Sequence, residues 1–107
     1  MKLAYVCTNY NNSSFTLAAV DGLMANDGHD IAVVVVANAS RPDEVAPLRR
    51  LAPRHRSVRV LEHPHNTGYF GGLNIGLRVL RETRPDIEWV VAGNNDLEFA
   101  ADFCDPV

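Results

Sequence analysis

The feature of this sequence that most limits its fold is an uninterrupted apolar run, Ile31–Ala37, built largely from valine. Such a run is typical of a strand covered on both faces, because it leaves no polar position for solvent. Three further segments, Lys2–Cys7, Val58–Leu61 and Ile87–Ala92, are also predicted to be strands. Since a membrane span needs about 20 apolar residues, we expect no membrane span.

Segments with helical spacing separate these strands. Apolar residues recur every three or four positions between Leu17 and Met24, and a second helix is predicted over Pro42–Leu51, where Pro42 suits the first turn. A third is expected around Leu73–Leu80. The resulting β-α-β-α-β-α-β order predicts a mainly parallel sheet with helices on both faces. We therefore expect a three-layer α/β/α, Rossmann-like fold.

Length and composition limit the function. A chain of 107 residues has the length of one domain, and we treat 1–107 as a single unit. The formal net charge of −3 gives no electrostatic basis for binding nucleic acid. Cys7 and Cys104 lack CxxC spacing, so buried free thiols in a cytoplasmic protein are favoured over a disulfide. The location could also be the inner face of the membrane.

Three polar clusters each follow a predicted strand directly: Thr8–Asn11, Asn38–Ser40 and Asn94–Asp96. The carboxyl ends of parallel strands lie along one edge of the sheet, and ligands bind there. We therefore expect the clusters to converge in space. The alternative is that these residues only form turns and helix caps.

Asp96 is the candidate metal ligand. One carboxylate can hold Mg²⁺ or Mn²⁺ when a diphosphate and waters complete the coordination. Such a metal would neutralise charge on a departing phosphate. Glu98 lies two residues further on. The alternative is a solvated aspartate in a turn.

The stretch HNTGYFGGLNIG, residues 65–76, contains four glycines, and its glycine-rich part before Leu73 is predicted to be a loop that leads into the third helix. It matches neither G-x-G-x-x-G nor a P-loop. The loop could approach a ligand closely, with Asn66 and Asn74 offering amide hydrogen bonds, or its glycines could serve tight packing. Gly76 is better explained by packing of its helix. The pair Tyr69-Phe70 could be a platform for a sugar or base, or an anchor in the core.

Taken together, TNYN (8–11), NAS (38–40), NTGYFGGLNIGL (66–77) and NND (94–96) resemble the motifs of family 2 glycosyltransferases with the GT-A fold. Within that family the chain is most similar to the rhamnosyltransferase-type branch. The resemblance extends from about Ala4 to Phe103, with the motifs in the same order.

The resemblance implies hexosyl or rhamnosyl transfer from a UDP- or dTDP-linked sugar to an acceptor, with inversion, as part of polysaccharide biosynthesis. Asp96 matches the metal-binding residue, with Mg²⁺ or Mn²⁺ as cofactor. The positions that match nucleotide-sugar contacts are Thr8, Tyr10, Asn38, Asn66, Gly68, Asn74 and Asn95.

The sequence departs from the family pattern in two ways. Ala37 stands where the pattern D-N-A-S has an acidic residue that helps to recognise the nucleoside. The family's acceptor-binding half and catalytic base lie beyond the NND motif, and this sequence ends at Val107. No catalytic residue can be named, so we expect the donor-binding half of the enzyme, inactive or weakly active alone.

Two alternatives stay open. The chain could be a non-catalytic nucleotide-binding or assembly module that a partner chain completes, with self-association through an exposed sheet edge. A flavodoxin-like or receiver-type domain is more distant, because a receiver needs an acidic pair after the first strand and Thr8-Asn9-Tyr10 offers none.

Overall fold

The computed structural model describes residues 2–26, 28–100 and 103–104. Strands alternate with helical segments along this part of the chain, as the sequence predicts, except that two helices lie between the second and third strands. In chain order the elements are β1 (Lys2–Asn9), α1 (Ser13–Met24), β2 (Asp30–Asn38), α2 (Pro42–Arg49), α3 (Leu51–Arg54), β3 (Val58–His63), α4 (Gly68–Thr83) and β4 (Trp89–Gly93).

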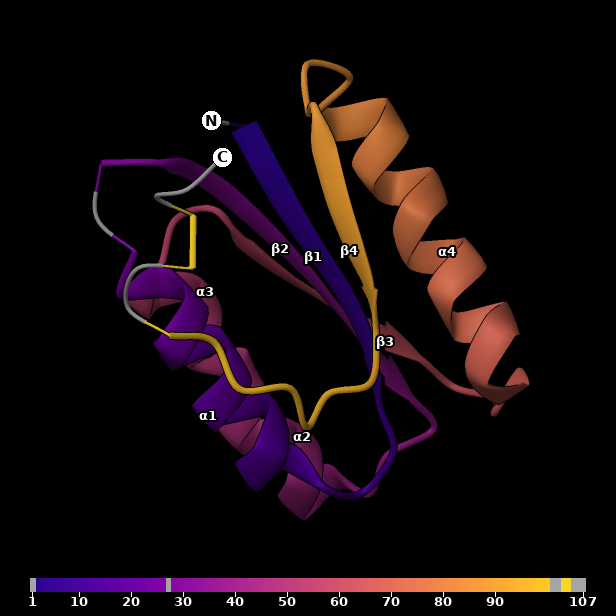
Figure 1. The fold of residues 1–107 in the computed structure, drawn as a ribbon. Helices are drawn as coiled ribbons and strands as arrows, with labels where there is room; N and C mark the ends of the chain where they lie inside the picture. The colour runs from indigo at the N-terminus through magenta and orange to yellow at the C-terminus, as the bar shows by residue number, and fades with distance from the viewer. Residues whose placement is uncertain (1, 27, 101–102, 105–107) are drawn as a thin grey trace.

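The sheet has the strand order β3-β2-β1-β4, and every neighbouring pair is parallel. Helices α1, α2 and α3 lie on one face, and α4 lies alone on the other (Figure 1). The predicted α/β class with a three-layer, mainly parallel arrangement is therefore confirmed. Because all four strands run the same way, their carboxyl ends and the loops that follow them share one edge.

The two faces of β1 and β2 carry separate apolar cores. Toward α1, α2 and α3, Tyr5 and Val35 pack with Leu23 and Leu48, all essentially inaccessible to solvent. Cys7 belongs to the same core. Cys7 and Cys104 are both buried and form no disulfide with each other, as predicted from their spacing.

The packing of α4 against the sheet depends on two glycines. A Cβ on Gly76 would lie 2.6 Å from Val6 Cγ1, and one on Gly72 would lie 2.5 Å from Thr8 Cγ2. Both glycines thus let the helix backbone lie directly on β1 and β2. The prediction that Gly76 serves helix packing is confirmed.

Two predicted boundaries were wrong. The third helix begins at Gly68 and not near Leu73, so the glycines expected in a loop before Leu73 lie in the first turns of α4; packing against the sheet outweighs the poor helix propensity of glycine. The helix predicted over Pro42–Leu51 ends at Arg49, and α3 follows it. The missing N–H of Pro53 leaves the Arg49 carbonyl without its helical donor at this break, although α2 itself accommodates Pro47.

Candidate functional site at the carboxyl edge of the sheet

The loops after β1 and β2 are joined through Ser40. Its hydroxyl accepts hydrogen bonds from Asn9 Nδ2 at 3.1 Å and from the Asn11 backbone N–H at 3.2 Å. It donates to the Asn9 carbonyl at 2.9 Å. The Arg41 backbone N–H donates to Asn11 Oδ1 at 2.7 Å. Residues about 30 positions apart therefore form one surface, which confirms that these two clusters converge.

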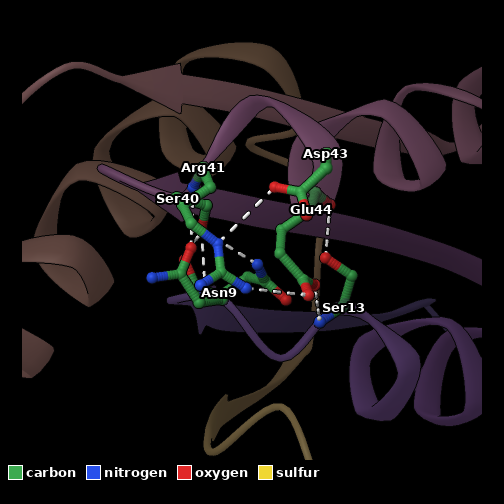
Figure 2. Close-up of polar contacts among 7 residues, drawn as sticks. Asn9, Ser13, Ser40, Arg41, Asp43 and Glu44 are labelled. Atoms are coloured by element: carbon green, nitrogen blue, oxygen red, sulfur yellow. Dashed lines mark hydrogen bonds and ion pairs between the residues drawn. The ribbon is translucent and has the colours of Figure 1, made fainter.

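Glu44 connects the helices that follow these loops. Its carboxylate accepts from the Ser13 backbone N–H at 3.0 Å, and the Ser13 hydroxyl donates to the Glu44 carbonyl (Figure 2). The hydrogen bond from the Ser13 backbone lowers the pKa of Glu44. Arg41 extends from the start of α2 toward Asp43 and Glu44, with N–O distances of 3.5 and 3.7 Å. Glu44 thus supplies the N-terminus of α1 with an acceptor from another helix.

Asn38, at the end of β2, holds the start of α4. Its side-chain Nδ2 donates to Asn66 Oδ1 at 3.1 Å and to the Gly68 carbonyl at 3.0 Å. Its Oδ1 accepts from the Thr67 backbone N–H at 3.1 Å. Asn38 is buried, so its amide is committed to shaping the 66–68 segment. The predicted residues Asn38, Asn66 and Gly68 are brought together by these bonds.

Asn95 is the most connected side chain of the last cluster. Its Nδ2 donates to Asn12 Oδ1 at 2.8 Å, to Thr16 Oγ1 at 2.9 Å and, at 3.4 Å, to Asn9 Oδ1. Thr16 Oγ1 in turn donates to Asn9 Oδ1 at 2.6 Å. Asn95 is only 7% exposed, whereas Asp96 beside it is exposed. The turn therefore buries its amide and presents its carboxylate.

Asn94, the residue before Asn95 and Asp96, is bonded to a side chain of the sheet. The Tyr5 hydroxyl donates to the Asn94 carbonyl. Burial raises the pKa of the Tyr5 hydroxyl, and the charges of Cys7, Asp96 and Tyr69 raise it further. The carboxylate of Asp96 therefore lies within electrostatic reach of the sheet core.

A cavity of about 430 Å³ adjoins this turn. Asp96 and Glu98 line it together with Phe15 and Phe99, and Gly22 of α1 forms part of its wall. Both carboxylates singled out from the sequence thus face one hollow between α1 and the segment after β4. Within the residues that the structure describes, no helix is long and apolar enough to cross a membrane.

The sequence profile of glycosyl transferase family 2 matches residues 5–107, nearly the whole chain. The chain belongs to this family. No curated protein is a significant match to it.

Solved glycosyltransferases share the fold. The mannosyltransferase PcManGT of Pyrobaculum calidifontis, in complex with GDP-Man and Mn²⁺, matches over 94% of this chain and 29% of its own, with TM-score 0.76 and 24% identity. Residues 1–349 of S. aureus TarS match over 99% of this chain and 31% of theirs, with TM-score 0.76 and 18% identity. TarS with UDP gives TM-score 0.72, 19% identity, and coverages of 90% and 28%. The chain spans less than a third of these proteins.

Family membership alone does not show whether this chain binds a metal ion, and the side chains present must answer that question. Among the described residues, no three His, Cys, Asp or Glu side chains gather into a metal-binding group. Asp96 alone could hold a hard divalent cation only if ligand oxygens supplied the other positions, as a diphosphate would. An exposed carboxylate on an anchored turn fits that requirement.

Three aromatic residues of this family 2 chain lie open at or near the same edge. Tyr10 is 55% exposed, Tyr69 is 40% exposed and Phe70 is 76% exposed. The interpretation of Tyr69-Phe70 as a core anchor is wrong, because both rings reach solvent from the first turn of α4. Exposed rings there could serve as a platform for a base or sugar.

Two of the predicted positions lie apart from the hydrogen-bonded cluster. Thr8 is half-buried beneath Gly72. Asn74 is exposed on α4, and successive helical residues are about 100° apart. It therefore lies nearly opposite Gly72 and Gly76, on the helix face away from the sheet.

The pairing of β2 with β3 shows which residue lies beside Ala37, the position where the sequence departs from the family pattern. Ala37 is 1% exposed, and its cross-strand neighbour is Glu62. Both line a cavity of about 280 Å³ that also includes Ser40 and His63. The Glu62 carboxylate accepts from Arg49 Nε at 2.8 Å, which lowers its pKa. An ionised carboxylate is thus present at this edge although position 37 carries none.

Reasoning from the sequence missed four residues of this edge: Asn12, Ser13, Thr16 and Glu44. Asn12-Ser13 before an apolar helix looks like ordinary capping. Thr16 and Glu44 carry no signal at all, because their partners are distant in the sequence.

Proposed function

We propose that this chain forms the donor-binding part of a glycosyltransferase that moves a hexosyl or rhamnosyl group from a nucleoside diphosphate sugar to an acceptor, with inversion. The observation that carries the proposal is the carboxyl edge itself, where loops from three strands are hydrogen-bonded together and one exposed carboxylate, Asp96, projects from an anchored turn. Family 2 membership supports the reaction class.

In this proposal the edge divides into a nucleotide side and a diphosphate side. Thr8 and Tyr10 contact the base, with the exposed Tyr10 ring available for stacking. Asn38 acts by fixing Asn66 and Gly68, which border the sugar. Asn74 matches the family motif by position, but its place on the outer face of α4 gives it no contact with this pocket in our assignment. UDP- and dTDP-linked sugars are the proposed donors, and the UDP complex of TarS supports a uridine nucleotide.

Asp96 would hold Mg²⁺ or Mn²⁺, and PcManGT with GDP-Man and Mn²⁺ supports a divalent ion. When bound, such an ion neutralises charge that develops on the leaving diphosphate. Asn95 would contribute by holding the turn from which Asp96 projects.

We assign no residue of this chain to binding or activating the sugar acceptor. Inversion requires a base that takes the proton of the acceptor hydroxyl, and we assign no residue of 1–107 to that role. We therefore propose that turnover, including any role in polysaccharide biosynthesis, depends on residues beyond this chain. Two buried cysteines without a disulfide between them support a reducing, cytoplasmic location, with the protein either in solution or at the inner membrane face.

The test is calorimetric titration of the chain with UDP, dTDP and GDP, each with and without Mn²⁺. We expect Mn²⁺ to tighten binding of at least one diphosphate, and Asp96→Asn to abolish that tightening. Glu82→Gln, an exposed carboxylate on α4, is the control and should behave as the wild type. Absence of binding to all three diphosphates, or an unchanged Mn²⁺ effect in Asp96→Asn, would overturn the proposal.

The second candidate, a non-catalytic module completed by a partner chain, is favoured by the apolar burial of Ala37 and by the edge strand β4. Trp89 and Val90 of β4 are 57% and 47% exposed. Binding of a diphosphate that is indifferent to Mn²⁺, together with self-association through β4, would favour this module over the enzyme.

A further inference from the structure

Asn12 occupies the N-cap position of α1 but makes no side-chain capping bond there. An N-cap Asn normally accepts from a backbone N–H in the first turn, and this contributes about 1 kcal/mol. Here the amide pairs with that of Asn95: Asn95 Nδ2 donates to Asn12 Oδ1 at 2.8 Å, and Asn12 Nδ2 donates to Asn95 Oδ1 at 3.3 Å. The helix thus gives up its own cap for a contact with a turn 83 residues away.

Thr16, one turn further along α1, contacts the Asn95 amide as well and determines its orientation. Its side chain is fully buried. The hydroxyl has one proton, which it donates to Asn9 Oδ1 at 2.6 Å, so its lone pairs face Asn95 Nδ2 at 2.9 Å. A hydroxyl in this state can only accept from Asn95. The orientation of the Asn95 amide is therefore fixed, with nitrogen toward Thr16.

The turn is also held in front of Asn95, where the Tyr5 hydroxyl donates to the Asn94 carbonyl. Anchors on Asn94 and Asn95 leave little freedom to the backbone of Asp96. A ligand that is already held in its binding geometry loses less entropy when it binds.

We propose that Asn12 and Thr16 are positioning residues of the diphosphate–metal site: they lock the Asn95 amide and thereby fix the direction in which the Asp96 carboxylate projects. This inference rests on the proposed function and assigns to α1 a part in donor binding. Groups that hydrogen-bond a metal ligand directly typically change metal affinity by about 10- to 100-fold; Asn12 and Thr16 bond to the neighbour of Asp96, so we expect an effect at the lower end of this range.

The first test compares Thr16→Val, which removes the hydroxyl at nearly constant shape, with Thr16→Ser, which keeps it. The readout is the ratio of diphosphate dissociation constants without and with Mn²⁺. We expect Thr16→Val to reduce this ratio about tenfold and Thr16→Ser to restore it toward the wild type. Thr83→Val, which removes an exposed hydroxyl bonded to the Val79 carbonyl, is the control and should leave the ratio unchanged.

The second test, Asn12→Ser, separates positioning from stability. Serine caps a helix about as well as asparagine, so the free energy of unfolding should stay within about 1 kcal/mol of the wild type. Serine is too short to reproduce the paired amide, so the Mn²⁺ ratio should still fall. A variant that stays folded yet loses the metal effect would not be expected of a merely structural residue.

The outcomes distinguish the two proposals. If the wild type binds no diphosphate in the presence of Mn²⁺, the proposed function fails and this inference fails with it. If the wild type shows the Mn²⁺ effect and Thr16→Val and Asn12→Ser retain it in full, only the inference is overturned. Equal weakening with and without Mn²⁺ would also overturn it, because that pattern indicates general damage to the pocket.

Discussion

Two residues beside the proposed nucleotide site hold left-handed backbone without being glycine. Asn11 has φ 55° and Ala39 has φ 58°. Asparagine tolerates this region, whereas alanine is disfavoured because its Cβ crowds the neighbouring carbonyl. Ala39 keeps the conformation because its N–H donates to the His63 carbonyl at 2.9 Å and Ser40 is bonded to β1. Strain of this kind is tolerated where the surroundings hold a loop in one shape.

We therefore predict that Ala39→Gly raises the free energy of unfolding by up to about 1 kcal/mol, while Ala39→Val lowers it by about 1–2 kcal/mol. Urea denaturation measures both. Ala18→Gly, at an exposed position within α1, is the control of opposite sign and should cost about 1 kcal/mol. A loss of stability in Ala39→Gly equal to that in Ala18→Gly would contradict the idea of strain at Ala39.

A single buried residue, Cys7, also makes the free energy of unfolding depend on pH. Burial raises the pKa of its thiol from 9.0 to about 12. The unfolded chain therefore releases this proton at lower pH than the folded chain does. The contribution of the protonated Cys7 thiol to the free energy of unfolding is fully present below pH 9 and is lost as the pH rises toward 12. We predict that the free energy of unfolding declines above pH 9.

Denaturation at a series of pH values between 7 and 11 measures this decline. Cys7→Ala should be less stable throughout, because it leaves a cavity, but its stability should fall less steeply with pH. A residual slope above pH 10 is expected from Tyr5, whose pKa is also raised by burial. Parallel profiles for the wild type and Cys7→Ala would show that the thiol is not responsible.

At the scale of elements, the position of α4 depends on two glycines spaced one turn apart. We predict that Gly76→Ala destabilises the protein by about 1–3 kcal/mol, since its Cβ would lie 2.6 Å from Val6 Cγ1. This loss should occur even though alanine favours a helix by about 1 kcal/mol. Glu82→Ala, exposed on the same helix, should change stability by less than about 0.5 kcal/mol. Thermal unfolding distinguishes them, and a stabilised Gly76→Ala would mean that the helix does not lie this close to the sheet.

At the scale of the whole molecule, the two edges of the sheet differ. Edge strand β3 carries Arg59 and Glu62, whereas β4 reads WVVAG and carries no charge. Charged residues protect natural edge strands from pairing with other chains. The β4 edge is therefore the better candidate for the self-association predicted from the sequence.

We predict that sedimentation shows self-association that increases with concentration, and that Val90→Lys weakens it about tenfold or more. Trp89 is the single tryptophan, and its fluorescence should shift to shorter wavelength on association. Glu82→Gln makes the same change of net charge at an exposed position of α4, outside the edge strand, and should associate as the wild type does. A chain that stays monomeric at all concentrations would refute this prediction.

The sequence by itself determined the order of the elements and the edge at which function is sought. Continuous apolar strands such as Ile31–Ala37 and the helical spacing between them are local patterns, and a parallel sheet follows from their alternation. The convergence of TNYN, NAS and NND follows in turn, because parallel strands end at one edge. Family membership was recognisable from the same motifs.

Only the tertiary structure decided what each side chain at that edge does. Asn12 was readable as a cap, and Asn38 and Asn95 as ligand contacts, yet all three amides bond to partners far along the chain. Whether Gly72 belongs to a loop or to a helix depended on the Thr8 side chain above which it packs. Hydrogen-bond and packing partners of this kind are set by the approach of distant segments, and a local sequence pattern contains no record of that approach.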